Sequence, residues 1–345
     1  MRDKIKLTVI ENGGRSTDIE HFRSYEVDAD LYQAADAFSM ELANPELDIC
    51  EGWQCKLYVN DQLALSGVID TVSSKCDKSG QTLKISGRDL MGLVVDQYCQ
   101  SFDLTSKTTL KALAEQLLSG VPLINVKAIR YEKPDAASIE EDMRLIASPG
   151  QQVFEVLKDF SRARGLLFYN LPSGEFVFGR PQASGPSLYK IIFNKSGGKN
   201  NAMSGERVSS CEKRYKKIIV YGQLQGEDNA SPQDASVRYE YVDPDTAFTL
   251  NKVFVSKDTS GQRSLKKCAQ LIAARQRFEA LKLSYTVPGH SQNGRVWDIN
   301  QLCDVEDGIN KVKAGQYLVY GRTFKLDKDN GPTTELRLGL PGVVL

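Results

Sequence analysis

The 345-residue sequence predicts an α+β fold that is mostly β, with two antiparallel β-barrel-like domains and a small α/β domain between them. Residues 1–99 alternate apolar and polar side chains between short turns, whereas residues 100–182 introduce helical spacing. Residues 183–345 return to alternation around one helix. Because single cores rarely grow much past ~250 residues, these three ranges are predicted to be separate domains.

The first range opens with a half-buried strand, because Ile5, Leu7 and Val9 alternate with polar residues. Asn60-Asp61 is a two-residue turn signal between two further alternating runs, and it predicts a β-hairpin. Strands at this spacing, joined by local turns, indicate an antiparallel barrel or sandwich.

The second range is predicted to hold two helices and a hairpin. Apolar residues recur at helical spacing over residues 110–118. For the second helix Ser148 is the predicted N-cap, Pro149 fits the first turn, and Gln151 completes a capping box. Two short apolar runs within residues 166–178, separated by Ser-Gly, are predicted to pair as a hairpin.

The third range is predicted to contain a strand at 218–221, a helix starting near Ser264 and a strand at 281–287. Asn330-Gly331 is a strong hairpin signal, followed by alternating leucines. Two polar stretches are predicted to be loops: residues 127–147 and 223–236.

The composition excludes several classes of protein. Lys and Arg total 44, and Asp and Glu total 44, so no general affinity for nucleic acid or anionic membrane is expected. We find no signal-peptide pattern and no run of 18 apolar residues, so no membrane insertion is expected. The seven cysteines lack any Cys-x-x-Cys pair, which favours free thiols in reducing cytoplasm.

Candidate catalytic and metal-binding residues are few. The chain has two histidines, His21 and His290, and Cys50 and Cys55 have no second pair to complete a zinc site. His290 and Ser291 lie in a Gly-x-Ser pattern that lacks the second glycine of a nucleophile elbow, so His290 is predicted to be a surface-loop residue. The sequence therefore predicts no catalytic, cofactor-binding or metal-binding residues and no cofactor.

Phosphate-binding loops are also absent, because Gly198-Lys199 is followed by asparagine instead of serine or threonine. The acidic pairs Glu140-Glu141 and Asp243/Asp245 are predicted to lie on the solvated surface, because such pairs are expected by chance among 44 acids. Two groups of basic residues are predicted to increase solubility and to protect sheet edges: the cluster 213–217 and the basic residues of the third helix. The alternative is that these residues line a surface that faces a polyanion.

Four groups of motifs succeed one another along the chain: Ala37–Leu42, Leu65–Asp70, Ile85–Leu90 with Val95-Asp96, and Gly294–Asn300 leading to Val305, Tyr317–Val319 and Thr334–Leu338. In this order and spacing the chain resembles the Mu-type phage tail proteins, the baseplate hub family of contractile tails. That family is related in fold to the hub part of type VI secretion spike proteins. The chain departs from it at Val68, where an aromatic residue is common, and in having no tryptophan near the N-terminus.

The resemblance implies a structural protein and no enzyme. It implies a homotrimeric ring that joins the tail tube to the central spike, contacts baseplate wedge proteins and surrounds a channel for DNA passage. It also implies a place in the virion tail baseplate, assembled in the cytoplasm of the bacterial host.

Three positions in these motifs have expected structural roles. Gly87 allows a close approach at a strand end, Arg88 and Asp89 are expected to form a local ion pair, and Trp297 is expected to anchor a β-core or an interface. Two alternatives to a hub remain open: a tail-associated enzyme acting on glycan or peptidoglycan, and a carbohydrate-binding module.

Overall fold

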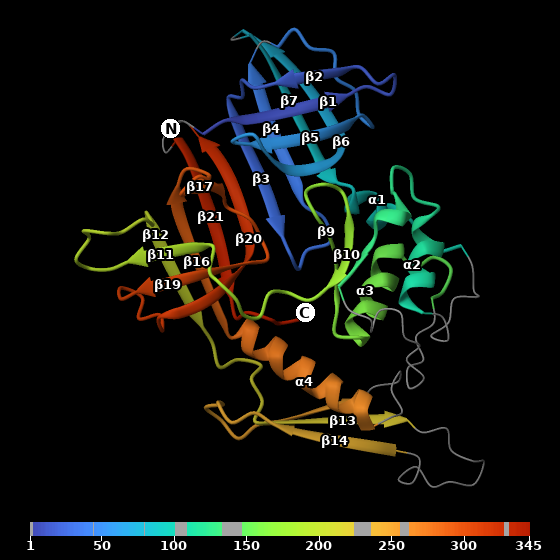
Figure 1. Ribbon diagram of the computed structural model, residues 1–345, viewed down its shortest axis with the longest axis vertical. Helices are drawn as coiled ribbons and strands as arrows, with labels where there is room; N and C mark the ends of the chain where they lie inside the picture. The colour runs from blue at the N-terminus through green and yellow to red at the C-terminus, as the bar shows by residue number, and fades with distance from the viewer. Residues whose placement is uncertain are drawn as a thin grey trace.

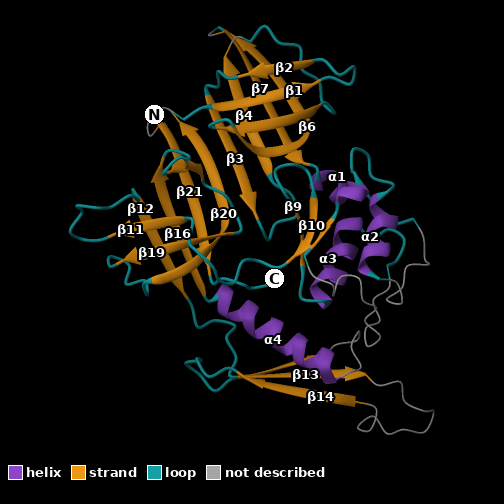
Figure 2. Cartoon of the chain, in the orientation of Figure 1, coloured by secondary structure: helices purple, strands orange, loops and turns teal. Residues whose placement is uncertain are grey.

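The computed structural model describes residues 3–43, 45–78, 80–100, 109–132, 147–223, 236–255, 262–327 and 331–345. Figure 1 shows an elongated molecule, in which the N-terminal strands lie at one end and a unit built from helix α4 and strands β13 and β14 lies at the other. Helices α1, α2 and α3 gather on one side of the molecule (Figure 2).

The N-terminal region contains seven strands and a short helix: β1 (Ile5–Ile10), β2 (Ser16–Ile19), β3 (Ser24–Asp30), β4 (Ala37–Ala43), β5 (Gln54–Val59), β6 (Gln62–Asp77), β7 (Gly80–Asp89) and α1 (Met91–Asp96). The predicted first strand is confirmed, with Ile5, Leu7 and Val9 buried. The predicted hairpin is confirmed as well. Asn60 and Asp61 both have positive φ, 49° and 62°, as the tight turn between β5 and β6 requires.

The C-terminal region contributes most of its strands to the same sheet: β11 (Tyr189–Phe193), β12 (Ser204–Ser209), β16 (Leu281–Pro288), β19 (Gln301–Asp307), β20 (Gly315–Asp327) and β21 (Gly331–Gly339). Two short strands, β17 (Ser291–Gln292) and β18 (Arg295–Val296), pair with each other. Antiparallel pairing of β20 and β21 agrees with the predicted hairpin, although Asn330 itself lies outside the described residues.

Strand pairing runs without a break from one region into the other. Its order is β12-β16-β21-β20-β3-β4-β7-β6-β5-β1-β2, and β11 and β19 join at β20. The mostly β fold is thus confirmed, but the two barrels are not: in the described part of the chain β3 pairs with β20, and the end strands β12 and β2 do not meet. One cluster of buried apolar side chains accordingly draws on both regions.

The middle region forms a small α/β unit with its own apolar cluster. Its elements are α2 (Leu110–Leu118), the 3-10 helix η1 (Val126–Ala128), β8 (Arg130–Tyr131), α3 (Val153–Ala163), β9 (Leu167–Asn170) and β10 (Phe176–Gly179). Helix α2 and the β9–β10 hairpin are confirmed. The predicted loop 127–147 contains most of η1 and all of β8, and residues 133–146 of it lie outside the described part.

The predicted start of the second helix was wrong. Helix α3 begins at Val153, not at Pro149, and its N-cap is Gln152. Gly150 has a φ of 83°, which a continuing right-handed helix does not allow. Gln151 still bonds back to Ser148, whose backbone N–H donates to the Gln151 side chain over 2.8 Å, so this half of the capping box closes a turn before the helix.

A third unit is inserted between β12 and β16. It consists of β13 (Lys217–Gln223), β14 (Ser236–Val242), β15 (Asn251–Val255) and α4 (Gln262–Glu279), in the sheet order β14-β13-β15. Most of the predicted loop 223–236 lies outside the described residues. Helix α4 covers one face of this sheet, with Ile218, Val220, Leu265, Ala269 and Ala273 at the centre of the contact. The predicted domain boundaries at 99/100 and 182/183 stay a prediction.

Candidate functional site

The outer face of the β13–β15 sheet, opposite α4, exposes several large apolar side chains. Five of the eleven exposed large apolar side chains lie on it or on the loop that leads into β15: Val242, Phe248, Leu250, Val253 and Val255. Val253 and Val255 are 53% and 64% exposed. Contiguous exposed apolar residues mark interaction sites more often than isolated ones do.

Strand register explains why these residues share one face. Side chains alternate along a strand, so Val253 and Val255 point away from α4, whereas Phe254 between them packs toward it. Ile219 lies opposite Val253, and Tyr221 lies opposite Val255. The β14 side of the face is charged instead, because Glu240 receives ion pairs from Lys217 and Arg238 at 2.8 and 2.7 Å.

Asp243 fastens the end of β14 to α4. Its carboxylate, only 1% exposed, is paired with Arg214 at 2.7 Å and with Arg277 at 3.1 Å. Burial alone would raise the pKa of Asp243, but the hydrogen bonds from Arg277 and Arg214 outweigh it and hold the pKa below the ordinary value. The prediction that Asp243 lies on the solvated surface was therefore wrong, and two of the basic residues assigned to solubility neutralise it.

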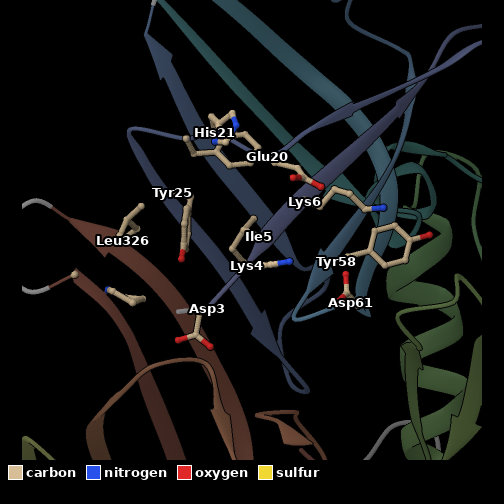
Figure 3. A pocket seen from close by; sticks show the side chains of 13 residues that line it. Asp3, Lys4, Ile5, Lys6, Glu20, His21, Tyr25, Tyr58, Asp61 and Leu326 are labelled. Carbon is tan, nitrogen blue, oxygen red and sulfur yellow. The ribbon is translucent and has the colours of Figure 1, made fainter. Parts of the chain in front are cut away.

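A hollow of about 610 Å³ lies where β1 meets β3 and the described ends of β20 and β21. In Figure 3 Tyr25 and Leu326 stand on one side of it, Tyr58 and Asp61 stand on the other, and Ile5 lies between them. Acidic and basic side chains are mixed in its walls: Asp3, Lys4, Lys6, Glu20 and Asp61. Because both signs of charge line the hollow, it favours neither an anionic nor a cationic ligand.

His290 bonds to Tyr25 and Asp3 of this hollow and is fully buried, so its prediction as a surface residue was wrong. The Thr334 hydroxyl donates to the Gly289 carbonyl at 2.6 Å, which leaves its oxygen to accept from Nδ1–H of His290 at 3.1 Å. Nε2 of His290 then accepts from the Tyr25 hydroxyl at 2.7 Å. This chain of bonds joins β3 to β21 and needs a neutral imidazole.

The pKa of His290 agrees with this assignment. Burial lowers it to about 4, more strongly than the nearby Asp3 carboxylate raises it. Asp3 also accepts the backbone N–H of His290 at 3.1 Å and the Asn60 side-chain amide at 2.7 Å. The group therefore acts as a fixed hydrogen-bonded link between the N-terminal and C-terminal strands.

A second polar link crosses the same junction. Arg337 on β21 reaches over β20 to Asp28 and Asp30 on β3, at 3.0 and 3.3 Å. Gly321 makes this crossing possible, because a Cβ at that position would collide with the Arg337 guanidinium. Burial raises the pKa of Asp30, which the Arg337 charge counteracts.

Arg322 is the most deeply buried cation of this junction, at 2% exposure. It stacks 4.1 Å from the Phe324 ring centroid and borders a cavity of about 80 Å³, together with Asp36 and Asp298. Burial lowers the pKa of Arg322, against the opposing influence of Asp298 and Asp36. The α/β unit closes this cavity through β9 and the residues after it.

The motif residues have the following roles. A Cβ on Gly87 would strike the Val68 carbonyl, so the expected close approach is confirmed. Trp297 is 2% exposed and packs 4.5 Å from the Tyr189 ring, which places it in a β-core. The expected Arg88–Asp89 pair was wrong: Arg88 pairs with Asp70 and Asp96, each at 2.7 Å. Strand alternation explains this, because neighbouring residues point to opposite faces.

The remaining candidates do not come together. Cys55 is buried, which raises its pKa to about 12, whereas Cys50 is exposed. Across the described ranges no three His, Cys, Asp or Glu side chains form a metal-binding group. Glu140 and Glu141 lie outside the described residues. None of the described helices combines the length and the apolar character that a membrane crossing requires.

Comparison with known proteins gives this fold its context. Residues 5–89 match the family described as Mu phage baseplate assembly protein GpP-like, N-terminal. The chain is also similar to the baseplate hub protein gp44 of Escherichia phage Mu, at 21% identity over 302 residues, which are 84% of this chain and 76% of the phage protein. The predicted resemblance to the Mu-type baseplate hub family is confirmed.

Two solved structures of tail proteins share the fold over nearly the whole chain. The tail protein from Neisseria meningitidis MC58 has a TM-score of 0.83 and 24% identity, and the alignment covers 98% of this chain and 97% of that protein. The 43 kDa tail protein of prophage MuSo2 from Shewanella oneidensis has a TM-score of 0.79 and 18% identity, with 97% and 98% covered.

The predicted relation in fold to type VI secretion spikes is also confirmed. An Escherichia coli component of that system has a TM-score of 0.57 and 11% identity, over 97% of this chain and 76% of that protein. The continuous sheet that replaces the two predicted barrels therefore lies within a fold that Mu-type tail proteins and this secretion component share.

Proposed function

We propose that the chain is a structural subunit of a phage or prophage tail baseplate, and that three copies form a hub ring. The ring would join the tail tube to the central spike, contact wedge proteins and surround the channel through which DNA passes. The observation that carries this proposal is the similarity to the Mu baseplate hub protein, which extends over 84% of the chain. The place of action would be the virion tail, after assembly in the host cytoplasm.

The junction between the β-regions supports a structural role. The His290 and Arg337 links both cross from the N-terminal strands to the C-terminal strands. Within each link the polar groups bond to each other and so fix the position of one set of strands relative to the other. A ring subunit must keep a fixed angle between the parts that touch its two neighbours, because a cyclic assembly closes only at one rotation.

The outer face of the β13–β15 sheet supports a role in assembly. Each copy in a trimeric ring must present a surface to the next copy, and this face exposes large apolar side chains such as Val253 and Val255. Within the proposed ring, we assign this face to contact with a second copy of the chain.

The test is the mass of the purified full chain in solution, measured by light scattering and sedimentation, alone and with its cognate spike protein. One chain has a mass of 38.3 kDa, so the hub proposal expects a particle of about three times that mass in at least one of the two samples. A chain that stays monomeric in both samples would contradict the trimer. Binding of the spike protein by that monomer would leave the tail assignment in place and refute the ring alone.

A further inference from the structure

A groove of about 300 Å³ lies between α3 and α4, where the β3–β4 turn and the C-terminal residue Leu345 also reach the surface. We propose that this groove is a docking site for an acidic peptide segment of another protein, with a large apolar side chain next to one or two carboxylates. The proposal concerns a contact separate from the outer face of the β13–β15 sheet, and it does not require the trimer.

The walls of the groove are stripes on two helices. Phe154, Lys158 and Arg162 follow one another at four-residue intervals along α3, so they share one face. Arg275 and Glu279 share a face of α4 in the same way. The two helices come from units far apart in the sequence, so the pairing of these stripes is a product of the tertiary structure.

Two of the charges in the walls are already neutralised. Lys158 pairs with Glu155 at 2.8 Å, and Glu279 pairs with Lys282 at 3.5 Å. Arg162 and Arg275 remain, and neither has an ion-pair partner within the described ranges. A helix dipole accounts for a cation in the last turn of α3, but it does not account for a second arginine that faces it from α4.

The two guanidinium groups act on each other. Burial lowers the pKa of Arg162, and the neighbouring Arg275 charge lowers it further, whereas the Asp159 and Glu155 carboxylates act in the opposite direction. A carboxylate placed between the two arginines would relieve this repulsion and could accept paired hydrogen bonds from either fork. The charge of the groove therefore complements an anionic partner.

The floor of the groove decides which kind of anion fits. It is bordered by the buried apolar residues Leu31, Leu167 and Phe168. Apolar floors with a few convergent polar groups are typical of sites for ligands that bury a side chain. A nucleic acid backbone would leave this floor unused and would need a longer track of cations than two free arginines provide.

The experiment is calorimetric titration of the full chain with acetyl-Glu-Phe-Glu-Leu-amide and two matched peptides. We expect the peptide in which glutamine replaces both glutamates, and the peptide in which alanine replaces phenylalanine and leucine, each to bind at least about tenfold more weakly. The doubly substituted chain Arg162→Gln/Arg275→Gln should lose at least about tenfold in affinity for the acidic peptide. Arg15→Gln is the matched control, because Arg15 is an exposed arginine on the turn between β1 and β2, and it should bind like the wild type.

Equal binding of the glutamate and glutamine peptides by the wild-type chain would overturn the proposal without the use of any variant, so a folding defect in the doubly substituted chain cannot protect it. The proposal also fails if Arg15→Gln weakens binding as much as the double substitution does. Tighter binding of a short DNA duplex, lost in the double variant, would show that the groove serves a polyanion instead.

Discussion

The junction between β3 and β20 and the outer face of the β13–β15 sheet depart from the usual distribution of residues in opposite ways. At the junction, polar and charged side chains such as His290, Arg322 and Asp30 are buried. On the outer face, valines such as Val253 and Val255 are exposed. Buried polar groups are costly unless they are matched, and exposed apolar patches are costly unless they are covered.

The difference indicates where each region finds its partners. The junction meets most of its hydrogen-bonding needs within the chain, through Tyr25, Thr334, Asp28 and Asp30. The outer face finds no cover among the described residues, and the cover that we propose for it is a second copy of the chain. Substitutions at the junction should therefore change the free energy of unfolding, whereas substitutions on the face should change association.

Arg337→Ala should have the largest effect on the stability of the chain. It removes the cation that neutralises Asp30, whose side chain is 7% exposed, and it cuts the link from β21 to β3. Breaking a buried ion pair by deleting one partner costs about 3 kcal/mol or more. Urea unfolding monitored by circular dichroism measures the loss.

Arg238→Ala is the matched control for that substitution. Arg238 pairs with Glu240 on the outer face, where the two side chains are 51% and 30% exposed. Exposed pairs contribute about 1 kcal/mol or less, so the control should stay within that range. If the two variants lose equal stability, the contrast between junction and face does not hold.

The second effect is a dependence of stability on pH that originates at His290. Its pKa falls from 6.5 in the unfolded chain to about 4 in the folded one. Below pH 6.5 the unfolded chain therefore takes up the proton first, and the folded state loses stability until the pH reaches about 4, by a total of roughly 3 kcal/mol. His290→Gln should remove this part of the profile.

The quantity to measure is the difference between the two profiles, because Asp89 titrates in the opposite sense. Burial raises the pKa of Asp89 to about 6, so its contribution to stability grows as the pH falls through that value. Subtracting the His290→Gln profile from that of the wild type cancels this term. A difference that stays flat between pH 6.5 and pH 4 would show that His290 is not held neutral.

The smallest effect on stability is expected for Val253→Asp combined with Val255→Asp. Both side chains are more than half exposed, so the two substitutions together should change the free energy of unfolding of the single chain by about 1 kcal/mol or less. The proposed ring should nevertheless dissociate, because charges would enter its apolar contact. Light scattering measures the mass of the particle.

Val208→Asp serves as the comparison for that experiment. Val208 is 49% exposed on β12, outside the β13–β15 face. This variant should keep the mass of the wild type. An unchanged mass for the double variant would refute the assignment of the face to a second copy, and dissociation of both variants would show that added charge alone is the cause.

Local elements of the fold were predictable because short-range rules govern them. The β5–β6 hairpin follows from Asn60 and Asp61, which tolerate the positive φ that the turn requires. Helix α2 follows from the spacing of its apolar residues, and its buried positions match that spacing. The capping signal at Ser148 does not start α3, because the left-handed conformation of Gly150 ends the turn there.

The positions of the polar residues were not predictable in the same way. His290 and Asp243 stand in polar loop sequences, and nothing in those sequences reveals that β-strands and α4 close over them. Their partners lie far along the chain; Tyr25 and His290, for example, are 265 positions apart. The groove between α3 and α4 was missed for the same reason, because its two arginines come from separate units.

The sequence by itself determined many of the strands, helices α2 and α4, the β5–β6 turn and the resemblance to Mu-type hub proteins, because alternation, helical spacing and motif order are all written in local residues. Only the tertiary structure decided that β3 pairs with β20, so that one continuous sheet replaces two barrels. Strands pair through backbone hydrogen bonds, which almost any sequence can form. Which strand becomes the neighbour therefore depends on burying the apolar side chains of the whole sheet face together, and local sequence does not show this.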